Sequence, residues 1–360
     1  MKENIYSVIV GTGSYIPENI IENSDFLKHQ FYDIDKKSID TPNDDLIEKF
    51  KKITNIAERR YASDELVTSD LAFFAAENAL KSSGIDKETL DGIIVAHNFG
   101  DVKKQNRKSD LVPSIATRVK HKLGIKNPYC TAFDLIFGCP GWLQGMIQAD
   151  YQIKSGDAKK MMVIGAEMLS RVSDPHDRDS MIYSDGAGAT ILEAKTSDEP
   201  IGILSHASRT DSINEAHLLE MKESNSPHYE GHEIYLKMQG RKLYEYALNN
   251  VPQLVKSCIE KANLTLEKIN KVLIHQANEK MDDAILHRIF KLYGSVSIPP
   301  DIMPMTINKL GNSSVATLPT LLDMIMKEIL PNHKLCANDN VVFASVGAGM
   351  NINAFTYKFC

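Results

Sequence analysis

Apolar residues in the first half of the chain fall into short continuous runs that alternate with longer stretches of helical spacing. The short runs predict buried strands at residues 5–10, 93–96, 159–169 and 184–194. The helical spacing predicts helices over residues 44–53, 68–83 and 113–123. Ser69 is the expected cap of the second helix, and Gly84 supplies the left-handed residue that commonly ends one. Strands that alternate with helices in this way predict mixed α/β sheets covered by helices.

The segment DLIFGCPGWLQGMIQADYQIKSG at residues 134–156 predicts a further helix that begins directly after Cys139. Apolar positions recur at helical spacing, Pro140 suits a first helical turn because its missing N–H needs no partner there, and Gly156 ends the segment. The positive end of the macrodipole at a helix N-terminus favours a thiolate and lowers the reference cysteine pKa of about 8.5. Cys139 is therefore a candidate nucleophile, and the alternative is a small buried apolar side chain.

The second half of the chain repeats the pattern of the first. LTLEKINKVLIHQAN aligns with IDKETLDGIIVAHN, so that Ile269 falls on Leu90 and Val272 on Ile93. An offset of about half the chain suggests duplication of one βαβ-rich unit. A long amphipathic helix is expected over residues 244–262, and the polar stretch 197–227 is interpreted as an interdomain connection.

Two polar positions and a glycine pair in the second half are candidates for chemistry. His275 ends the strand VLIH, where α/β folds build sites, although a single such histidine is more often a hydrogen-bonded structural residue. Asn312 precedes a helix expected from about residue 314 to 330, where it is either a functional group or a cap. Gly347 and Gly349 follow a buried strand and either expose backbone N–H groups to a ligand or form a tight hairpin.

Composition excludes several classes of protein. At 360 residues the chain is long enough for two domains or one duplicated unit, and 43% hydrophobic with 24% charged residues is ordinary for a globular protein. No apolar run approaches the roughly 18 residues of a membrane helix, and no secretory signal is evident, so a cytoplasmic protein is expected. The net charge of −6 argues against general nucleic-acid binding. Five cysteines without paired CxxC spacing argue against a disulfide framework or a metal site.

Together these segments resemble the thiolase superfamily, and most closely its 3-oxoacyl-[acyl-carrier-protein] synthase III family. The resemblance runs along nearly the whole chain, and its specific part is a cysteine segment followed by HQAN and then GNSS. It implies an α/β fold of five layers, α-β-α-β-α, made from two similar halves. Residues 1–198 would carry the nucleophile and residues 199–360 the histidine and asparagine, in a chain that usually forms a homodimer.

The resemblance assigns a reaction to individual residues. The family's catalytic triad falls on Cys139, His275 and Asn312, and its backbone oxyanion hole on the amides of Cys139 and Gly349. The implied reaction is a Claisen condensation, in which an acyl group rests on the sulfur and the enolate of a malonyl- or ketoacyl-type thioester attacks it. A neutral His275 and Asn312 would donate hydrogen bonds to that enolate. No metal, nicotinamide or flavin is needed.

The implied substrates are thioesters of coenzyme A or of the phosphopantetheine arm of acyl-carrier protein, with no tightly bound cofactor. Arg178 matches an arginine near the family's cofactor entrance, and Lys280 matches a basic residue that docks the carrier protein. Lys49 and Ile53 stand where well-known members have an aromatic residue that stacks on adenine and an arginine. A primer delivered by carrier protein is therefore favoured over coenzyme A.

Other functions remain as alternatives. Residues 28–44 and 98–111 are interpreted as insertions that reshape the entrance or the dimer surface. A specialised ketosynthase that joins two acyl chains, or cyclises them to resorcinol-like lipids, fits the residues as well as initiation of fatty-acid synthesis does. Elongating synthases are disfavoured by Asn312, and plant-type polyketide synthases by the absence of GFGPG. A non-catalytic scaffold that binds acyl-carrier protein is disfavoured because all three triad positions are intact.

Overall fold

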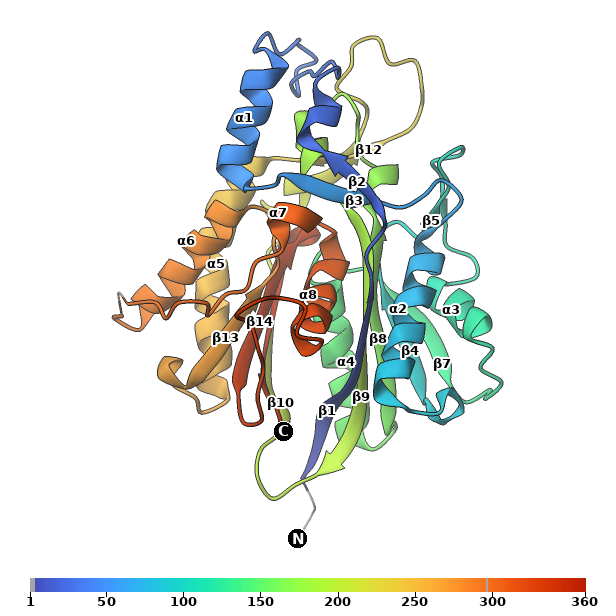
Figure 1. Ribbon diagram of the computed structural model, residues 1–360, viewed down its shortest axis with the longest axis vertical. Coiled ribbons are helices and arrows are strands. Elements are labelled where there is room, and N and C mark those ends of the chain that lie inside the picture. The colour runs from blue at the N-terminus through green and yellow to red at the C-terminus, as the bar shows by residue number, and fades with distance from the viewer. Residues whose placement is uncertain (1–3, 296) are drawn as a thin grey trace.

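The computed structural model describes residues 4–295 and 297–360, and two sheets form its centre (Figure 1). The first sheet has the order β1-β9-β8-β4-β7. Its strands are β1 (Ile5–Tyr15), β9 (Asp185–Thr196), β8 (Lys160–Met168), β4 (Gly92–Ala96) and β7 (Thr131–Leu135). β4 is parallel to β7 and β8, whereas β8, β9 and β1 are successively antiparallel.

The second sheet has the order β10-β15-β14-β13 and repeats this arrangement. Its strands are β10 (Gly202–Thr210), β15 (Asn351–Lys358), β14 (Asn340–Gly347) and β13 (Ile269–Ile274). β13 is parallel to β14, and β14, β15 and β10 are successively antiparallel, as β4, β8, β9 and β1 are in the first sheet. β13 and β4 thus hold equivalent places, as the aligned sequences predict. The division into domains 1–198 and 199–360 stays a prediction.

Helices lie on both outer faces and between the sheets (Figure 1). On the outer face of the first sheet are α2 (Thr68–Ser83) and α3 (Ile115–Leu123). Between the sheets are α4 (Gly141–Ser155) and α8 (Thr317–Met326). On the outer face of the second sheet are α5 (Gly240–Lys261) and α6 (Glu279–Leu292). The expected five-layer α-β-α-β-α architecture is therefore confirmed.

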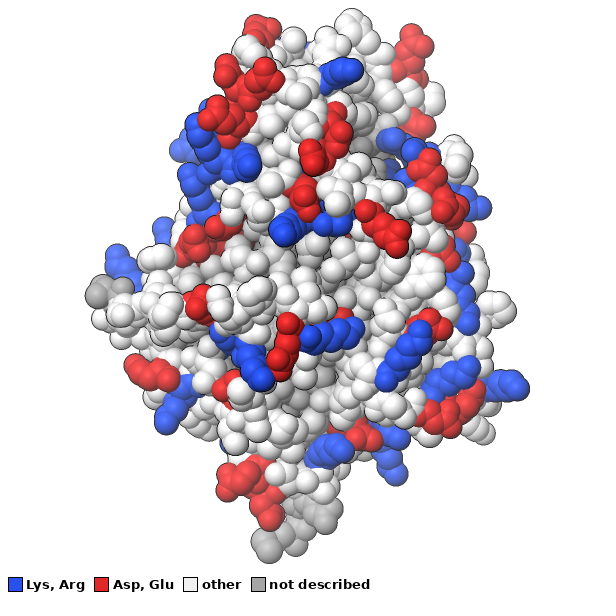
Figure 2. Space-filling view, in the orientation of Figure 1, with Lys and Arg blue, Asp and Glu red and all other residues white. Residues whose placement is uncertain are grey.

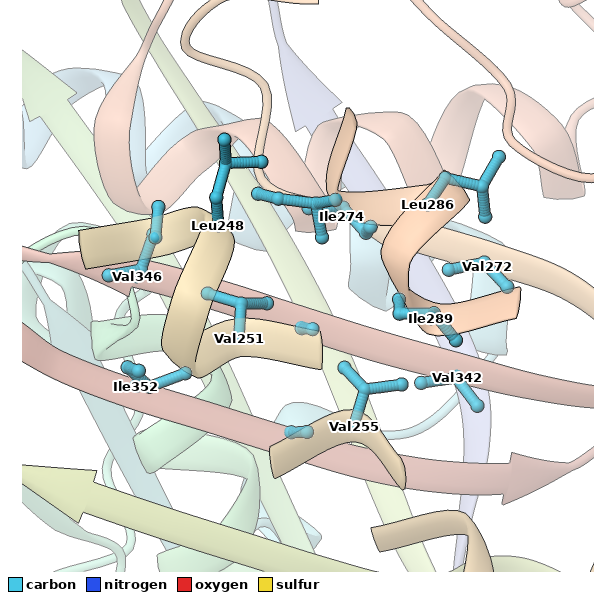
Figure 3. Packing of buried hydrophobic residues seen from close by; sticks show 14 of the residues in the cluster. Leu248, Val251, Val255, Val272, Ile274, Leu286, Ile289, Val342, Val346 and Ile352 are labelled. Atoms are coloured by element: carbon cyan, nitrogen blue, oxygen red, sulfur yellow. The ribbon is translucent and has the colours of Figure 1, made fainter. Parts of the chain in front are cut away.

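Continuous apolar packing joins these layers. Between the sheets, Trp142 of α4 lies 6.0 Å and 6.1 Å, ring centre to ring centre, from Phe343 and Phe355. Figure 3 shows the seam on the other side of the second sheet, where side chains of α5 such as Val255 face Val342 of β14. Each buried aliphatic or aromatic side chain of this kind contributes about 1.5–3 kcal/mol, so these seams fix how the layers sit.

Smaller elements gather at the end of the molecule where the chain leaves β14 and enters α4 (Figure 1). They are β2 (Asn19–Glu22), β3 (Glu58–Tyr61), α1 (Asn43–Thr54), β5 (Asp101–Val102), β6 (Ser109–Asp110), β11 (Leu219–Lys222), β12 (Tyr235–Met238) and α7 (Ile307–Leu310). β2 pairs with β3, β5 with β6 and β11 with β12. Among the helices described, none combines the length and the apolar character that crossing a bilayer requires.

Three predictions about single elements are wrong. Val67, not Ser69, precedes α2 as its cap, and the Ser69 hydroxyl donates instead to Asp101 at 2.8 Å. The helix expected over residues 314–330 is a short 3-10 turn, Ser314–Ala316, followed by α8, which ends at Met326. The stretch 197–227 is not a plain connection, because it contains β10 and β11. β10 lies at a sheet edge and its later residues are exposed, so it lacks the apolar run that reveals a strand.

Candidate active site

Side chains from three separate connections line one cavity of about 350 Å³. Cys139 stands just before α4, His275 just after β13, and Asn312 just before the 3-10 turn Ser314–Ala316. The fold therefore brings together all three residues that the sequence singles out. Gly349, in the turn between β14 and β15, lines the same cavity.

Two glycines allow the turn after β14 to lie directly against the cysteine. A Cβ added to Gly347 would stand 2.4 Å from the Cys139 nitrogen, and one added to Gly138 would stand 2.7 Å from the nitrogen of Ala348. Gly138 also has a φ of +66°, which favours glycine. The chain forms a tight hairpin here, one of the two alternatives for these glycines, and the same turn carries Gly349 (φ +77°) to the cavity wall.

The thiol of Cys139 is less acidic than its place before a helix suggests. The pKa of Cys139 is raised to about 11, chiefly by burial and to a smaller extent by the nearby Glu167, while a hydrogen bond from Ser314 acts in the opposite direction. The Ser314 hydroxyl donates to the sulfur at 3.4 Å. The predicted fall in the cysteine pKa is therefore wrong, because desolvation of the charged form outweighs the field of the helix terminus.

His275 is held by the backbone and is neutral. Its N–H donates to the Ala344 carbonyl at 2.9 Å, which continues the pairing of β13 with β14. The adjacent Gln276 side chain donates to the Pro304 carbonyl at 2.9 Å and accepts from the Thr306 N–H at 2.8 Å. Within the described part of the chain, neither ring nitrogen of His275 has a hydrogen-bond partner. Burial lowers the pKa of His275 to about 4, so the ring has one donor and one acceptor at neutral pH.

Asn312 is oriented by its neighbours on both sides. Its N–H donates to the Ile182 carbonyl at 2.9 Å, and its carbonyl accepts from the Ser184 N–H at 2.8 Å. Its side-chain Oδ1 accepts from the Ser314 N–H at 2.8 Å. Since an amide oxygen must face that donor, the Nδ2 group remains for donation to another partner.

The inner cavity has an apolar wall that sequence reasoning did not identify. Five residues of the β11–β12 hairpin line it: the apolar Leu219, Met221, Leu236 and Met238, and Glu220. In the register of this hairpin, Leu219 is opposite Met238 and Met221 opposite Leu236, so the four apolar side chains lie on one face. An apolar wall beside Cys139 suits an acyl chain. This wall is not predicted from the sequence, because β11 lies within residues 197–227, which are interpreted there as an interdomain connection.

An outer cavity of about 920 Å³ continues the inner one to the surface, and Met281 and Asn312 line both. Arg178, Lys49 and Ile53 line the outer cavity, so the predicted entrance residues meet at one mouth. Residues 32–34 and Ile39 of the insertion 28–44 form part of its wall, as the sequence predicts. Asn98 and Phe99 of the second insertion line the inner cavity.

Charges around the outer cavity are of both signs. Lys49, Arg178, Arg241 and Lys242 line it together with Asp33, Asp177 and Asp179. Figure 2 shows separate acidic and basic groups over α1, which has aspartates in its first turn and lysines in its last. Lys280 is exposed in the first turn of α6, between two residues, Asn278 and Met281, that line the cavity. The mouth is thus a mixed surface with an excess of cations.

Comparisons with known proteins place the chain in one family. Residues 133–212 match the family described as 3-oxoacyl-[acyl-carrier-protein] synthase III, and residues 259–359 match its C-terminal part. A beta-ketoacyl-[acyl-carrier-protein] synthase III of Vibrio parahaemolyticus is 32% identical over 99% of this chain and 100% of its own. The crystal structure of the Aquifex aeolicus 3-oxoacyl-[acyl-carrier-protein] synthase III is 30% identical, has a TM-score of 0.79, and is matched over 98% of this chain and all of its own. The Thermus thermophilus synthase is 29% identical with a TM-score of 0.81, over 98% of this chain and 99% of its own. The chain belongs to the 3-oxoacyl-[acyl-carrier-protein] synthase III family of condensing acyltransferases.

Proposed function

We propose that the protein transfers an acyl group from a thioester to Cys139 and then condenses it with a carrier-bound malonyl or ketoacyl thioester. The observation that carries this proposal is the meeting of Cys139, His275, Asn312 and Gly349 on one cavity with an apolar wall. In the first step the Cys139 thiolate attacks the thioester carbonyl and the donor thiolate departs, so that one thioester replaces another. The backbone N–H groups of Cys139 and Gly349 would stabilise the tetrahedral oxyanion.

In the second step a malonyl thioester loses carbon dioxide, and the electron pair of the broken bond forms an enolate. His275 and the Nδ2 group of Asn312 would donate hydrogen bonds to the enolate oxygen. A neutral imidazole suits this role, because a buried imidazolium would be costly. The enolate carbon then attacks the acyl group on Cys139, the thiolate departs, and a 3-oxoacyl carrier is released. Each donor of this kind contributes about 3 kcal/mol.

The direct test is the intact mass of the protein after incubation with an acyl donor. Wild-type protein should gain one acyl group, and the Cys139→Ala variant none. Asn312→Ala and His275→Ala should still be acylated but should lose condensation by about 100-fold or more. Condensation at the wild-type rate by both donor variants would refute the triad, and absence of label on Cys139 would favour a non-catalytic carrier-binding scaffold.

The donor that we propose is acyl-carrier protein. Lys49 and Ile53 at the mouth offer neither an aromatic surface nor a fixed cationic fork for an adenine nucleotide. The basic residues that line the outer cavity, together with the neighbouring Lys280, would attract an acidic carrier protein. Matched kinetics with one acyl group on coenzyme A and on carrier protein test this choice, and a preference for coenzyme A would refute it.

A homodimer is the assembly that we propose. β7 lies at the edge of the first sheet, where a second copy can continue the pairing. Large apolar side chains are exposed along and beside it: Tyr129 (86%), Ile136 (61%) and Phe133 (38%). Ile136 also lines the inner cavity, so a partner would complete its wall. Sedimentation should give a dimer for wild type and a monomer for Ile136→Asp. We place the enzyme in the cytoplasm, where reducing conditions keep Cys139 a thiol.

A second candidate function is the joining or cyclisation of two long acyl chains, and the apolar β11–β12 wall favours it. The same mass measurement with donors from acetyl to dodecanoyl distinguishes the two. Preference for acetyl with a malonyl extender supports initiation of fatty-acid synthesis. Preference for a long donor with a ketoacyl extender supports the specialised reaction.

A further inference from the structure

Behind Cys139 a chain of hydrogen bonds leads to a buried carboxyl group. The Ser314 hydroxyl, which donates to the Cys139 sulfur at 3.4 Å, accepts from Nδ2 of Asn98 at 3.3 Å. The same Nδ2 donates to Oε2 of Glu167 at 2.6 Å, and the Asn98 backbone N–H donates to that oxygen at 3.0 Å. Asn98, Ser314 and Cys139 line the inner cavity, whereas Glu167 lies behind them.

The Asn98 side chain is fixed at both ends. Its Oδ1 accepts from the N–H of Gly138, the residue before the nucleophile, at 3.0 Å. Its Nδ2 donors are engaged by Glu167 and Ser314. Asn98 therefore touches the cysteine segment through the backbone and through Ser314, and its orientation follows from the carboxylate that accepts from it.

Ser314 itself occupies a demanding conformation. Its φ of +53° lies in the left-handed region that residues with a side chain rarely adopt. The Asn312 side chain holds its N–H. Close packing of β8 adds a constraint, because a Cβ on Gly165 would stand 2.2 Å from the Val315 carbonyl oxygen. The serine hydroxyl is thus aimed by its surroundings.

Among the described residues, only Asn98 donates hydrogen bonds to the Glu167 side chain. Glu167 is fully buried near the end of an apolar strand, and its Oε1 has no hydrogen-bond partner within residues 4–295 and 297–360. Burial raises the pKa of Glu167 to about 7, with Asp185 adding to the effect and His97 and Asn98 opposing it. Burial of an ionisable group costs free energy, and groups with shifted pKa values cluster at functional sites.

We propose that Glu167 and Asn98 are positioning residues for the nucleophile: Glu167 orients Asn98, and Asn98 holds Ser314 where its hydroxyl hydrogen-bonds the Cys139 sulfur. This inference rests on the proposed role of Cys139. A hydrogen bond to sulfur stabilises the thiolate over the thiol. Loss of any member of the relay therefore removes the bond from Ser314 and lowers the reactivity of Cys139.

The experiment measures the alkylation rate of Cys139 by iodoacetamide at pH 8, resolved by peptide mass, with variants of the relay. Ser314→Ala should slow alkylation about tenfold, the effect of one hydrogen bond to a charged group, and Asn98→Ala by at least as much, because it also removes the acceptor of the Gly138 N–H. The double variant should be no slower than Asn98→Ala, within about twofold, because Asn98→Ala already removes the bond from Ser314. A further tenfold loss in the double variant would show independent action and overturn the relay.

Glu167 is tested by the same comparison of single and double variants, which separates the effect of its hydrogen bond from the effect of its charge. Glu167→Ala should slow alkylation in the wild-type background but not in the Ser314→Ala background, where only the removed negative charge acts. Glu167→Gln keeps an acceptor oxygen for Asn98 and should stay within about threefold of wild type. Equal slowing by Glu167→Ala in both backgrounds, or none in either, would overturn the proposal.

Controls lie within the protein. Cys336 and Cys360 are exposed free cysteines whose alkylation reports the reagent in every sample. Ser313→Ala removes a neighbouring hydroxyl that contacts Thr317 at 3.3 Å instead of Cys139, and should leave the rate unchanged. Acyl transfer to Cys139 in wild type is measured in parallel. Its absence would refute the proposed function, whereas its presence with unaltered alkylation in the variants would refute only the relay.

Discussion

Self-acylation of Cys139 should accelerate about tenfold for each pH unit between about pH 6 and pH 9. Burial raises the pKa of the thiol to about 11, so at pH 7 about one molecule in ten thousand carries the thiolate. The thiolate is the attacking species, so its fraction limits the rate. Because the fraction rises tenfold per unit until the pKa is reached, a plateau is not expected within this range.

The two pKa values also bear on where the thiol proton goes. Burial lowers the pKa of His275 to about 4 and raises that of the Cys139 thiol to about 11, so the imidazole is a poor acceptor for this proton. We therefore expect the thiol proton to leave to solvent, and His275 to remain neutral and available as a donor to the enolate.

The assay follows intact mass at short times with a single acyl thioester. His275→Ala should keep the tenfold slope and lose little acylation, while its condensation falls about 100-fold or more. Cys139→Ala corrects for hydrolysis of the donor at high pH. A flat profile in wild type that becomes sloped in His275→Ala would refute this reasoning, because it would mean that the histidine takes the proton.

Three further changes test the walls and the mouth of the site. Gly347→Ala would place a Cβ 2.4 Å from the Cys139 nitrogen, so we expect about 1–3 kcal/mol of destabilisation and about 100-fold less activity. Gly186→Ala, whose Cβ would have no neighbour closer than 3.6 Å, is the matched control, and equal effects on thermal unfolding and activity would contradict the packing argument. Lys280→Glu should slow the reaction with carrier-bound but not small acyl thioesters. The difference should fade at high salt, as the Debye length falls from about 10 Å at 0.1 M to about 3 Å at 1 M, and an equal loss on both substrates would indicate damage to the site. Leu236→Trp should shift the preferred donor in a mass-resolved competition toward shorter chains, and an unchanged preference would exclude the β11–β12 hairpin as the acyl wall.

Most of the sheet and helix framework could be predicted because it rests on periodicity within single segments. The helix α4 and its end at Gly156 both follow from local spacing and backbone preference. β10 is not predicted from the sequence, because a half-exposed edge strand has no continuous apolar run. The prediction that Ser69 caps α2 is wrong, although a serine near a helix start is usually a cap. Here the Ser69 hydroxyl donates instead to Asp101, a carboxylate distant in the sequence.

The pKa of Cys139 depends on residues that are distant in the sequence as well as on its neighbours. A helix N-terminus can be read from Pro140 and the residues that follow it, and its effect on a thiolate has a definite sign. The opposing effect, burial beneath the turn after β14 and beside Glu167, comes from segments more than 20 residues away in the chain. Desolvation shifts pKa values by more than a helix terminus does, so the local inference had the wrong sign.

The candidate site is best understood as a contact between the two similar halves of the chain. Cys139 and the relay residues Asn98 and Glu167 come from the first half, while His275 and Asn312 come from the second. Their meeting depends on backbone contacts too close for side chains, at Gly138 against Ala348 and at Gly347 against Cys139. A substitution at either glycine would push these segments apart and separate the nucleophile from its donors. The glycines of the VGAGM segment would therefore belong to the proposed catalytic apparatus together with Cys139, His275 and Asn312, because they allow the close approach on which its geometry depends.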